Sequence, residues 1–371
     1  MIGFGTPAPM FYGRTRARAD FAFHSVAGRY IVLAFLGQGE LPAARAALEA
    51  VAARASVFDD HKASFFGVTL DPRDAGDPAF ADVIPGRRFF FDTDGAISDR
   101  YGLLDRQADG QVRFRPAVFL LDPALRVMER VTLTEIGPLL DRLAALPEVD
   151  DHAGVALTAP VLIVPRVFEP AFCQALIGDY LAHGGTESGT MVEVDGMTVG
   201  RLDPGFKRRQ DHTVSDPKLL AAARARVHDR LVPEIRRAFS FAATRMERYI
   251  VARYPADTGG FFRPHRDNTT KGTAHRRFAV SINLNAEAFS GGDLRFPEFG
   301  SRTYRPPTGG AVVFSCSLLH EATPVTAGVR YAFLPFLYDD AAARIRADNQ
   351  RFLAGSDSDR MEETVSADPP A

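Results

Sequence analysis

The second half of the chain contains the stretch Arg253-Tyr-Pro-Ala-Asp-Thr-Gly-Gly-Phe-Phe-Arg-Pro-His-Arg-Asp267, which ends in a His-x-Asp motif. On an extended segment, His265 and Asp267 point to the same face because side chains alternate along a strand. Their Cα atoms are then about 6.6 Å apart, at ~3.3 Å per residue. Metal–nitrogen and metal–oxygen bonds are each ~2.0–2.2 Å long, so this pair can bind a single metal ion.

A third metal ligand has to come from another segment. Ala311–Ser315 is a strand-like apolar run, and His320 follows it within a few residues. Two histidines and one carboxylate leave other coordination positions open, which is the arrangement of non-haem Fe(II) oxygen chemistry. We therefore predict that His265, Asp267 and His320 bind the metal.

Arg330 follows His320 by ten residues (330 − 320) and begins the strand-like segment Arg330–Tyr338. We expect this strand to return beside the His320 strand and to point its guanidinium into the same cavity. An arginine binds a carboxylate through two parallel, charge-assisted hydrogen bonds. Arg330 is therefore our candidate for the far carboxylate of a dicarboxylate that chelates the metal.

Each of these four residues also has an ordinary explanation. The chain has nine histidines, so a His-x-Asp pair arises easily by chance. A lone histidine after a strand is commonly structural, and a lone arginine commonly lies on the surface. The prediction of a metal and co-substrate site rests on the order in which the four residues follow one another within one strand-rich region.

The region from Glu247 onward has short strand-like segments and Gly/Pro/Asn/Asp turns, as in an all-β sandwich or barrel. Helices are predicted over Glu169–His183 and Lys218–Phe239, with Pro233 kinking or dividing the second. Between them, Gly185–Asp216 is predicted to be a loop or lid that faces the substrate. Its basic residues could hold an anionic group, but a short basic run is more often a solvated loop: Arg201, Lys207, Arg208 and Arg209.

The first half of the chain alternates strand-like and helix-like segments. Apolar runs at Tyr30–Leu36 and Phe65–Leu70 are typical of strands buried on both faces. Leu41–Val57 and Ile136–Leu146 have helical periodicity, and 117–133 suggests a hairpin. This alternation predicts an α/β layer around a mostly parallel sheet.

This first half resembles a peroxiredoxin or thioredoxin-like domain. In that family a peroxidatic cysteine stands just after the first buried strand. The corresponding stretch here, Gly37–Ala44, has none, and both cysteines of the chain, Cys173 and Cys316, lie in the second half. Without a thiolate there is no thiol chemistry, so we exclude a thiol peroxidase and expect a structural or docking role. The resemblance rests on Gly28–Leu36, Phe66–Asp71, Asp92–Gly95, Tyr101–Leu103 and Arg115–Asp122.

The second half resembles the prolyl 4-hydroxylase-like branch of the Fe(II)/2-oxoglutarate-dependent dioxygenases. That resemblance implies a double-stranded β-helix (jelly roll) with flanking helices. It also implies Fe(II), 2-oxoglutarate and O2, with ascorbate as an optional addition. The motifs that carry it lie between Glu247 and Asp340: Tyr254-Pro, Thr258-Gly259, His265-x-Asp267, Ala279–Asn285, Ser290–Phe296 and Arg330-Tyr-Ala.

Two further residues are assigned to the co-substrate site by the same resemblance. Tyr254 matches a tyrosine that lines the iron pocket, with packing at a strand end as the alternative. Asn283 stands where relatives have a tyrosine that helps bind the far carboxylate, and it has a shorter reach. Phe336 stands where the nucleic-acid demethylase branch has a second arginine, which argues against demethylation of a nucleic-acid substrate.

The resemblance implies hydroxylation of an unactivated C–H bond, with release of succinate and CO2. The expected substrate is a prolyl or other amino-acid side chain, free or in a peptide or protein. The alternative is a non-catalytic metal-binding scaffold built from a degenerate redoxin and a jelly roll. Bound iron without succinate production would favour that alternative.

The bulk composition adds expectations about environment. The net charge of −2 gives no reason to expect a polyanionic partner. The chain has only two cysteines and no CxxC pair, which fits a reducing cytoplasm. Neither a signal peptide nor a membrane span is expected, and the first domain could support a homodimer or protein docking. The expected parts are a redoxin-like domain (1–148), a linker (149–160), an oxygenase domain (161–345, core about 247–340) and a helix end with a disordered tail (346–371).

Overall fold

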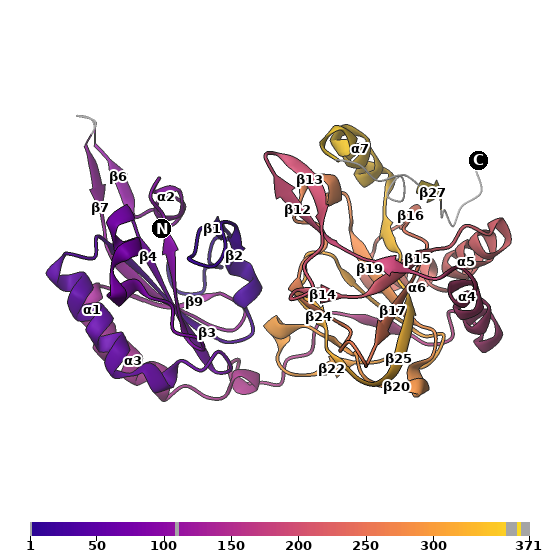
Figure 1. The fold of residues 1–371 in the computed structure, drawn as a ribbon, viewed down its shortest axis with the longest axis horizontal. Coiled ribbons are helices and arrows are strands. Elements are labelled where there is room, and N and C mark those ends of the chain that lie inside the picture. Colours follow the sequence, from indigo (N-terminus) through magenta and orange to yellow (C-terminus); the bar gives the residue numbers. More distant parts are fainter. Residues whose placement is uncertain (1, 108–110, 354–361, 365–371) are drawn as a thin grey trace. The chain divides into compact units, whose positions relative to one another are not determined.

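The computed structural model describes residues 2–107, 111–353 and 362–364, and these form two compact units (Figure 1). The N-terminal unit comprises residues 1–159 with Pro297–Ser301. The C-terminal unit comprises Pro160–Phe296 with residues 302–371.

The N-terminal unit is built on a five-stranded sheet with the order β5-β4-β3-β8-β9. The β5–β4 and β4–β3 pairings are parallel, whereas β3–β8 and β8–β9 are antiparallel. The sheet is therefore mixed and not mostly parallel, because the predicted hairpin supplies its antiparallel half. The strands are β3 (Tyr30–Gly37), β4 (Ala63–Thr69), β5 (Arg87–Phe91), β8 (Ala117–Leu121) and β9 (Val127–Val131).

Helices α1 (Pro42–Ala53) and α3 (Ile136–Ala144) lie side by side against this sheet (Figure 1). Alternating residues of β3 such as Val32 and Ala34 pack under them. Aromatic side chains fill another part of this unit's core, where the Phe66 and Phe90 rings stack with centroids 5.6 Å apart. The arrangement confirms the thioredoxin-like α/β fold. The remaining elements are β1 (Tyr12–Gly13), β2 (Phe21–Ala22), α2 (Ala96–Arg100), β6 (Leu104–Arg106) and β7 (Val112–Phe114).

The C-terminal unit contains two larger sheets, as a jelly roll does. The major sheet has the order β11-β15-β17-β25-β19-β26-β16-β27, with β10, β20 and β23 joined to it. The minor sheet has the order β14-β18-β24-β21-β22.

The major-sheet strands are β10 (Leu162–Val164), β11 (Thr186–Glu187), β15 (Gln210–Thr213), β16 (Arg245–Glu247), β17 (Ile250–Pro255), β19 (Phe278–Asn283), β20 (Phe289–Gly291), β23 (Ala311–Ser315), β25 (Val325–Phe333), β26 (Phe336–Tyr338) and β27 (Glu362–Thr364). The minor-sheet strands are β14 (Lys207–Arg208), β18 (Phe261–His265), β21 (Leu294–Arg295), β22 (Thr303–Tyr304) and β24 (His320–Ala322).

Three helices pack on the major sheet: α4 (Pro170–His183), α5 (Pro217–Arg230) and α6 (Val232–Phe239) (Figure 1). The division of α5 from α6 at Leu231 confirms the predicted effect of Pro233. Alternate strand residues such as Val280, Ile282 and Phe333 share one apolar core with these helices. The intervening residues of these strands point to the opposite face of the major sheet, where they can line a site.

Strand β15 also contacts α4 through a polar pair. The His212 Nε2 lies 2.7 Å from Oδ2 of Asp179 on α4. Since side chains alternate along a strand, the neighbouring Asp211 points to the opposite face of β15.

The prediction that Gly185–Asp216 is a loop is wrong. The segment contains β11, β14 and β15 together with a hairpin of β12 (Thr190–Val194) and β13 (Met197–Arg201). Its polar composition hid these strands, and β14 and β15 pair with strands that lie far away in the sequence. Lys207 and Arg209 are only 7% exposed, so this basic run is not a solvated loop.

Helix α7 (Asp340–Asn349) follows the last core strand. Of the segment predicted to be a disordered tail, residues 362–364 form β27, which pairs with β16. Residues 354–361 and 365–371 lie outside the described residues. No helix in the described part of the chain has both the length and the apolar character needed to cross a membrane.

Two leucines of α4 test the packing of this helix. Leu176 is fully buried in the core, whereas Leu181 is 67% exposed. We expect Leu176→Ala to lower the free energy of unfolding by roughly 2–5 kcal/mol, because it removes buried methyl groups and leaves a cavity. Leu181→Ala should change it by less than about 0.5 kcal/mol. Urea unfolding of both variants measures this, and equal losses would contradict the assignment of the buried face.

Candidate active site

Two histidines face each other on paired strands of the minor sheet. His265 ends β18 and His320 begins β24, and they are direct partners in the antiparallel register. Their ring centroids are 4.3 Å apart. Each Nδ1 donates to a backbone carbonyl, that of Arg263 at 2.7 Å and that of Leu318 at 3.0 Å. In the neutral rings, the Nε2 atoms are therefore the ones that carry free lone pairs.

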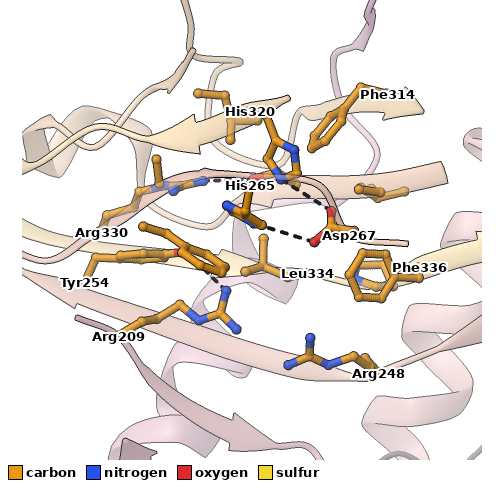
Figure 2. Close-up of a pocket in the computed structure, with 17 residues that line it drawn as sticks. Arg209, Arg248, Tyr254, His265, Asp267, Phe314, His320, Arg330, Leu334 and Phe336 are labelled. Atoms are coloured by element: carbon orange, nitrogen blue, oxygen red, sulfur yellow. Dashed lines mark hydrogen bonds and ion pairs between the residues drawn. The ribbon is translucent and has the colours of Figure 1, made fainter. Parts of the chain in front are cut away.

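The carboxylate of Asp267 completes this group. Its backbone N–H donates to the Cys316 carbonyl at 3.0 Å, which fixes the turn after β18. Oδ1 lies 3.5 Å from the His265 Nε2, and Oδ2 lies 3.3 Å from the His320 Nε2. Figure 2 shows the three side chains converging on one point, and their ligand atoms all lie within 4.8 Å of one another.

Burial and mutual charge set the protonation of this group. Burial would raise the pKa of Asp267, but the imidazoles of His320 and His265 hold it below its usual value. Burial, with the nearby charge of His265, lowers the pKa of His320 to about 4. At neutral pH Asp267 is therefore an anion and His320 is neutral, which are the states that bind a metal.

Arg330 reaches the same cavity from the opposite sheet. We expected its strand to lie beside that of His320, and this is wrong: β25 pairs with β17, β19 and β20 of the major sheet, whereas β24 belongs to the minor sheet. Arg330 also lies in the middle of its strand and not at the start. The cavity therefore lies between the two sheets, with the histidines on one wall and Arg330 on the other.

The guanidinium of Arg330 is buried, with 2% exposure. Its Nη2 donates to the Ser281 Oγ at 2.8 Å, and its Nε donates to the Asn283 Oδ1 at 3.3 Å. Its central carbon lies 5.1 Å from the centre of the Tyr254 ring. Among the described residues no carboxylate lies within ion-pair distance of Arg330. Burial lowers the pKa of this guanidinium, and an anionic ligand would offset that cost.

The two remaining candidates, Tyr254 and Asn283, differ in their position relative to the cavity. Tyr254 lines the cavity, and its hydroxyl accepts a hydrogen bond from Nη1 of Arg209 at 3.3 Å. Asn283 contacts Arg330 and donates from Nδ2 to the Pro306 carbonyl at 2.9 Å, but it is not among the lining residues. Its placement is that of a residue that orients Arg330.

Several lining residues escaped the sequence analysis. Ser281 stands two residues before Asn283 on β19, and the strand period places both on one face. Arg209 was named as a possible anion-binding residue but assigned to a solvated loop; the alternation Lys207-x-Arg209-x-Asp211 would have indicated an inward-facing strand. The other lining residues that were not predicted to belong to the site are Arg248, Phe262, Ala279, Val280, Leu294, Phe314, Ala322, Leu334, Pro335 and Phe336.

Comparison with known families agrees with this geometry. Residues 249–338 match the model of the 2OG-Fe(II) oxygenase superfamily, and residues 4–130 match that of the AhpC/TSA family. The region that holds the site is thus a 2OG-Fe(II) oxygenase domain. The chain as a whole joins this domain to an AhpC/TSA domain that has no cysteine, which confirms both resemblances.

Individual relatives are each similar to one part of the chain. A PKHD-type hydroxylase of Cupriavidus metallidurans is 33% identical over 104 residues, which cover 26% of this chain and 44% of the relative. The chain therefore spans less than half the length of this curated relative. A prolyl-4-hydroxylase structure from Pseudomonas putida is 21% identical, with 53% of this chain and 97% of that chain covered and a TM-score of 0.36. The peroxidoxin BcpB of Mycobacterium tuberculosis is 17% identical, with coverage of 39% and 96% and a TM-score of 0.33.

The low pKa of His320 predicts a pH dependence of stability in the metal-free protein. Between about 4 and 6.5 the unfolded chain protonates this histidine and the folded chain does not. Unfolding then takes up a proton, so the free energy of unfolding should fall as the pH drops from 6.5 towards 4. Asp267 titrates below its ordinary value of 3.8, outside this range. Urea unfolding in the presence of a chelator measures this. The free energy of unfolding should depend less on pH in His320→Gln than in the wild-type protein, and equal pH dependence in the two would contradict the prediction.

Proposed function

We propose that the protein is an Fe(II)- and 2-oxoglutarate-dependent hydroxylase. One observation carries the proposal: a His/Asp/His group and a buried arginine without a carboxylate partner face the same cavity from opposite sheets. The match to the 2OG-Fe(II) oxygenase superfamily supports it. So does the similarity to a PKHD-type hydroxylase.

The donor group fits a divalent metal. Lone pairs of two Nε2 atoms face the oxygens of Asp267 at 3.3 and 3.5 Å, an arrangement that is repulsive unless a cation lies between them. The Nδ1–carbonyl hydrogen bonds fix the ring orientations, as partners of metal-bound histidines usually do. His265, Asp267 and His320 would bind Fe(II), and this set leaves positions open for a chelating ligand.

The opposite wall fits the far end of 2-oxoglutarate. Arg330 would bind its far carboxylate, and the cost of burying the guanidinium is offset when that anion arrives. Ser281 lines the cavity beside Arg330 and could donate its hydroxyl hydrogen to the same carboxylate. Asn283 would keep Arg330 in position.

When bound, iron and 2-oxoglutarate supply the O2-dependent chemistry that hydroxylates an unactivated C–H bond and releases succinate and CO2. The protein holds the reactants in place and excludes water. Phe262, Phe314 and Phe336 give the cavity apolar walls, which keep water away from the reacting carbon. The substrate we propose is a prolyl or other amino-acid side chain, free or in a peptide or protein.

Anaerobic titration with Fe(II) and then 2-oxoglutarate tests this function. The visible charge-transfer band should appear in the wild-type protein and be absent in His320→Ala. Arg330→Gln should need roughly 30-fold more 2-oxoglutarate or beyond, because a buried charged hydrogen-bonded pair contributes about 2 kcal/mol or more. Arg237→Gln is the matched control, since this side chain of α6 is 78% exposed.

Two results would contradict the proposal. Absence of the band in the wild-type protein would exclude the 2-oxoglutarate site. A normal band without succinate formation, across free amino acids and peptides as co-reactants, would favour the non-catalytic scaffold.

The AhpC/TSA domain should have no thiol peroxidase activity. Cys173 and Cys316 are buried in the C-terminal unit. Burial raises the pKa of Cys173 to about 11 and that of Cys316 well above its usual value, so neither is a thiolate at neutral pH. Metal-free protein with a thiol reductant should consume peroxide no faster than a Cys173→Ala/Cys316→Ala variant. A difference between the two would overturn this prediction.

A further inference from the structure

A second group of candidate metal ligands lies outside the cavity, where helix α4 meets strand β15. Asp179 and His183 stand one turn apart near the C-terminal end of α4, so their side chains lie on the same face of the helix. His212 comes from β15. The ligand atoms of these three residues all lie within 4.8 Å of one another, as do those of the His/Asp/His group in the cavity. None of the three lines the cavity.

The carboxylate of Asp179 faces both imidazoles. Its Oδ2 lies 2.7 Å from Nε2 of His212, and its Oδ1 lies 3.2 Å from Nδ1 of His183. The two rings are parallel to within 5°, and their centroids are 5.4 Å apart. On a tetrahedral ion with bonds of ~2.0–2.2 Å, two ligand atoms lie about 3.3–3.6 Å from each other. Small shifts of these side chains therefore bring the ligand atoms to the distances that a metal ion requires.

The charge of Asp179 is balanced by no lysine or arginine. Its side chain is only 10% exposed, and among the described residues its ion-pair partners are the two histidines alone. A nearly buried carboxylate is costly unless a positive charge accompanies it. The C-terminal end of α4, where Gly184 is the cap, also favours a cation, because the last carbonyls of a helix carry partial negative charge.

Hydrogen bonds hold the group together in the metal-free protein. An ionised carboxylate only accepts hydrogen bonds, so Nε2 of His212 donates to Asp179. A metal ion would replace this proton, because histidine coordinates through a free lone pair. The ring of His183, whose Nδ1 donates to the Asp179 backbone carbonyl at 2.9 Å, is 60% exposed and can turn to present either nitrogen.

The donor set indicates the class of ion. Two imidazoles and one carboxylate suit Zn(II) and related transition metals. Calcium and magnesium prefer sets of oxygen ligands, which this group does not offer. The exposure of His183 lets water reach the group and complete the coordination.

We propose that Asp179, His183 and His212 bind a second metal ion, of the Zn(II) class, that fastens the end of α4 to β15. The role of this ion is structural, because it joins a helix to a strand and none of its ligands faces the cavity. The inference does not depend on the proposed function.

The test is the Zn(II) stoichiometry of the untagged full-length protein, measured by equilibrium dialysis against a metal buffer and by elemental analysis. The wild-type protein should bind two ions per chain, one in each group of ligands. His183→Ala should bind one. Its half-saturating Zn(II) concentration for the second ion should rise roughly 100-fold or more, since loss of an outer-shell partner alone costs about 10–100-fold.

A histidine of the neighbouring helix serves as the matched control. His228 lies on α5 and is 33% exposed, and His228→Ala should still bind two ions. Because His183 is exposed, His183→Ala should fold, and urea unfolding with a chelator should give the same midpoint as for the wild-type protein.

The possible results separate this inference from the proposed function. If the wild-type protein binds one ion and His183→Ala binds none, this inference holds and the proposed function fails. If both bind one ion, or both bind two with the same half-saturating concentrations, this inference fails. If the wild-type protein binds no ion, both fail.

Hydrogen exchange locates the second ion without any variant. Zn(II) should slow the exchange of the backbone amides of residues 180–183, because fastening the last turn of α4 suppresses its local opening. Unchanged exchange of these amides in wild-type protein saturated with Zn(II) would overturn the inference.

Discussion

The antiparallel pairing of β18 with β24 is the interaction on which the site depends. It places His265 opposite His320, although 55 residues separate them in the chain (320 − 265). Backbone hydrogen bonds set this register, so the spacing of the two rings does not rely on loop conformation. Asp267 is held to the same frame by its bond to the Cys316 carbonyl. The three side chains of the proposed metal site are thus held in place by the backbone of the sheet.

The alternation of side chains in the major sheet explains how one layer serves two purposes. Residues such as Ile282 and Phe333 share a core with helices α4 to α6, while Ser281, next to Ile282 on β19, lines the cavity. The apolar face provides the stability that allows the other face to bury charges. A second buried network supports the cavity: Glu247 accepts from Nε of Arg276 at 2.7 Å, and the Arg276 guanidinium lies over the ring of the lining residue Phe336.

Much of the site could be predicted from the sequence because its motifs are local. His265 and Asp267 are two residues apart, and His320 and Arg330 stand in apolar strands whose pattern is visible without a structure. The sheet that contains each strand could not be predicted, since strand pairing is non-local. Arg330 was therefore expected beside His320, when it lies across the cavity from it. Arg209 was assigned to a solvated loop, and Asp211 was not considered, for a related reason: a polar, inward-facing strand has the composition of a loop.

Strand β15 links helix α4 to the cavity of the oxygenase domain through two consecutive residues. His212 pairs with Asp179 of α4 on one face, and Asp211 holds Arg209 and Arg248 on the other. The two residues are consecutive on one strand that is hydrogen-bonded to β11 and β17, so a shift of the β15 backbone would move both pairs. A substitution on α4 that moves the His212–Asp179 pair should consequently also move the Asp211 carboxylate, which contacts Arg209 and Arg248. The packing of α4 and the position of the cavity's arginines therefore depend on the same short strand.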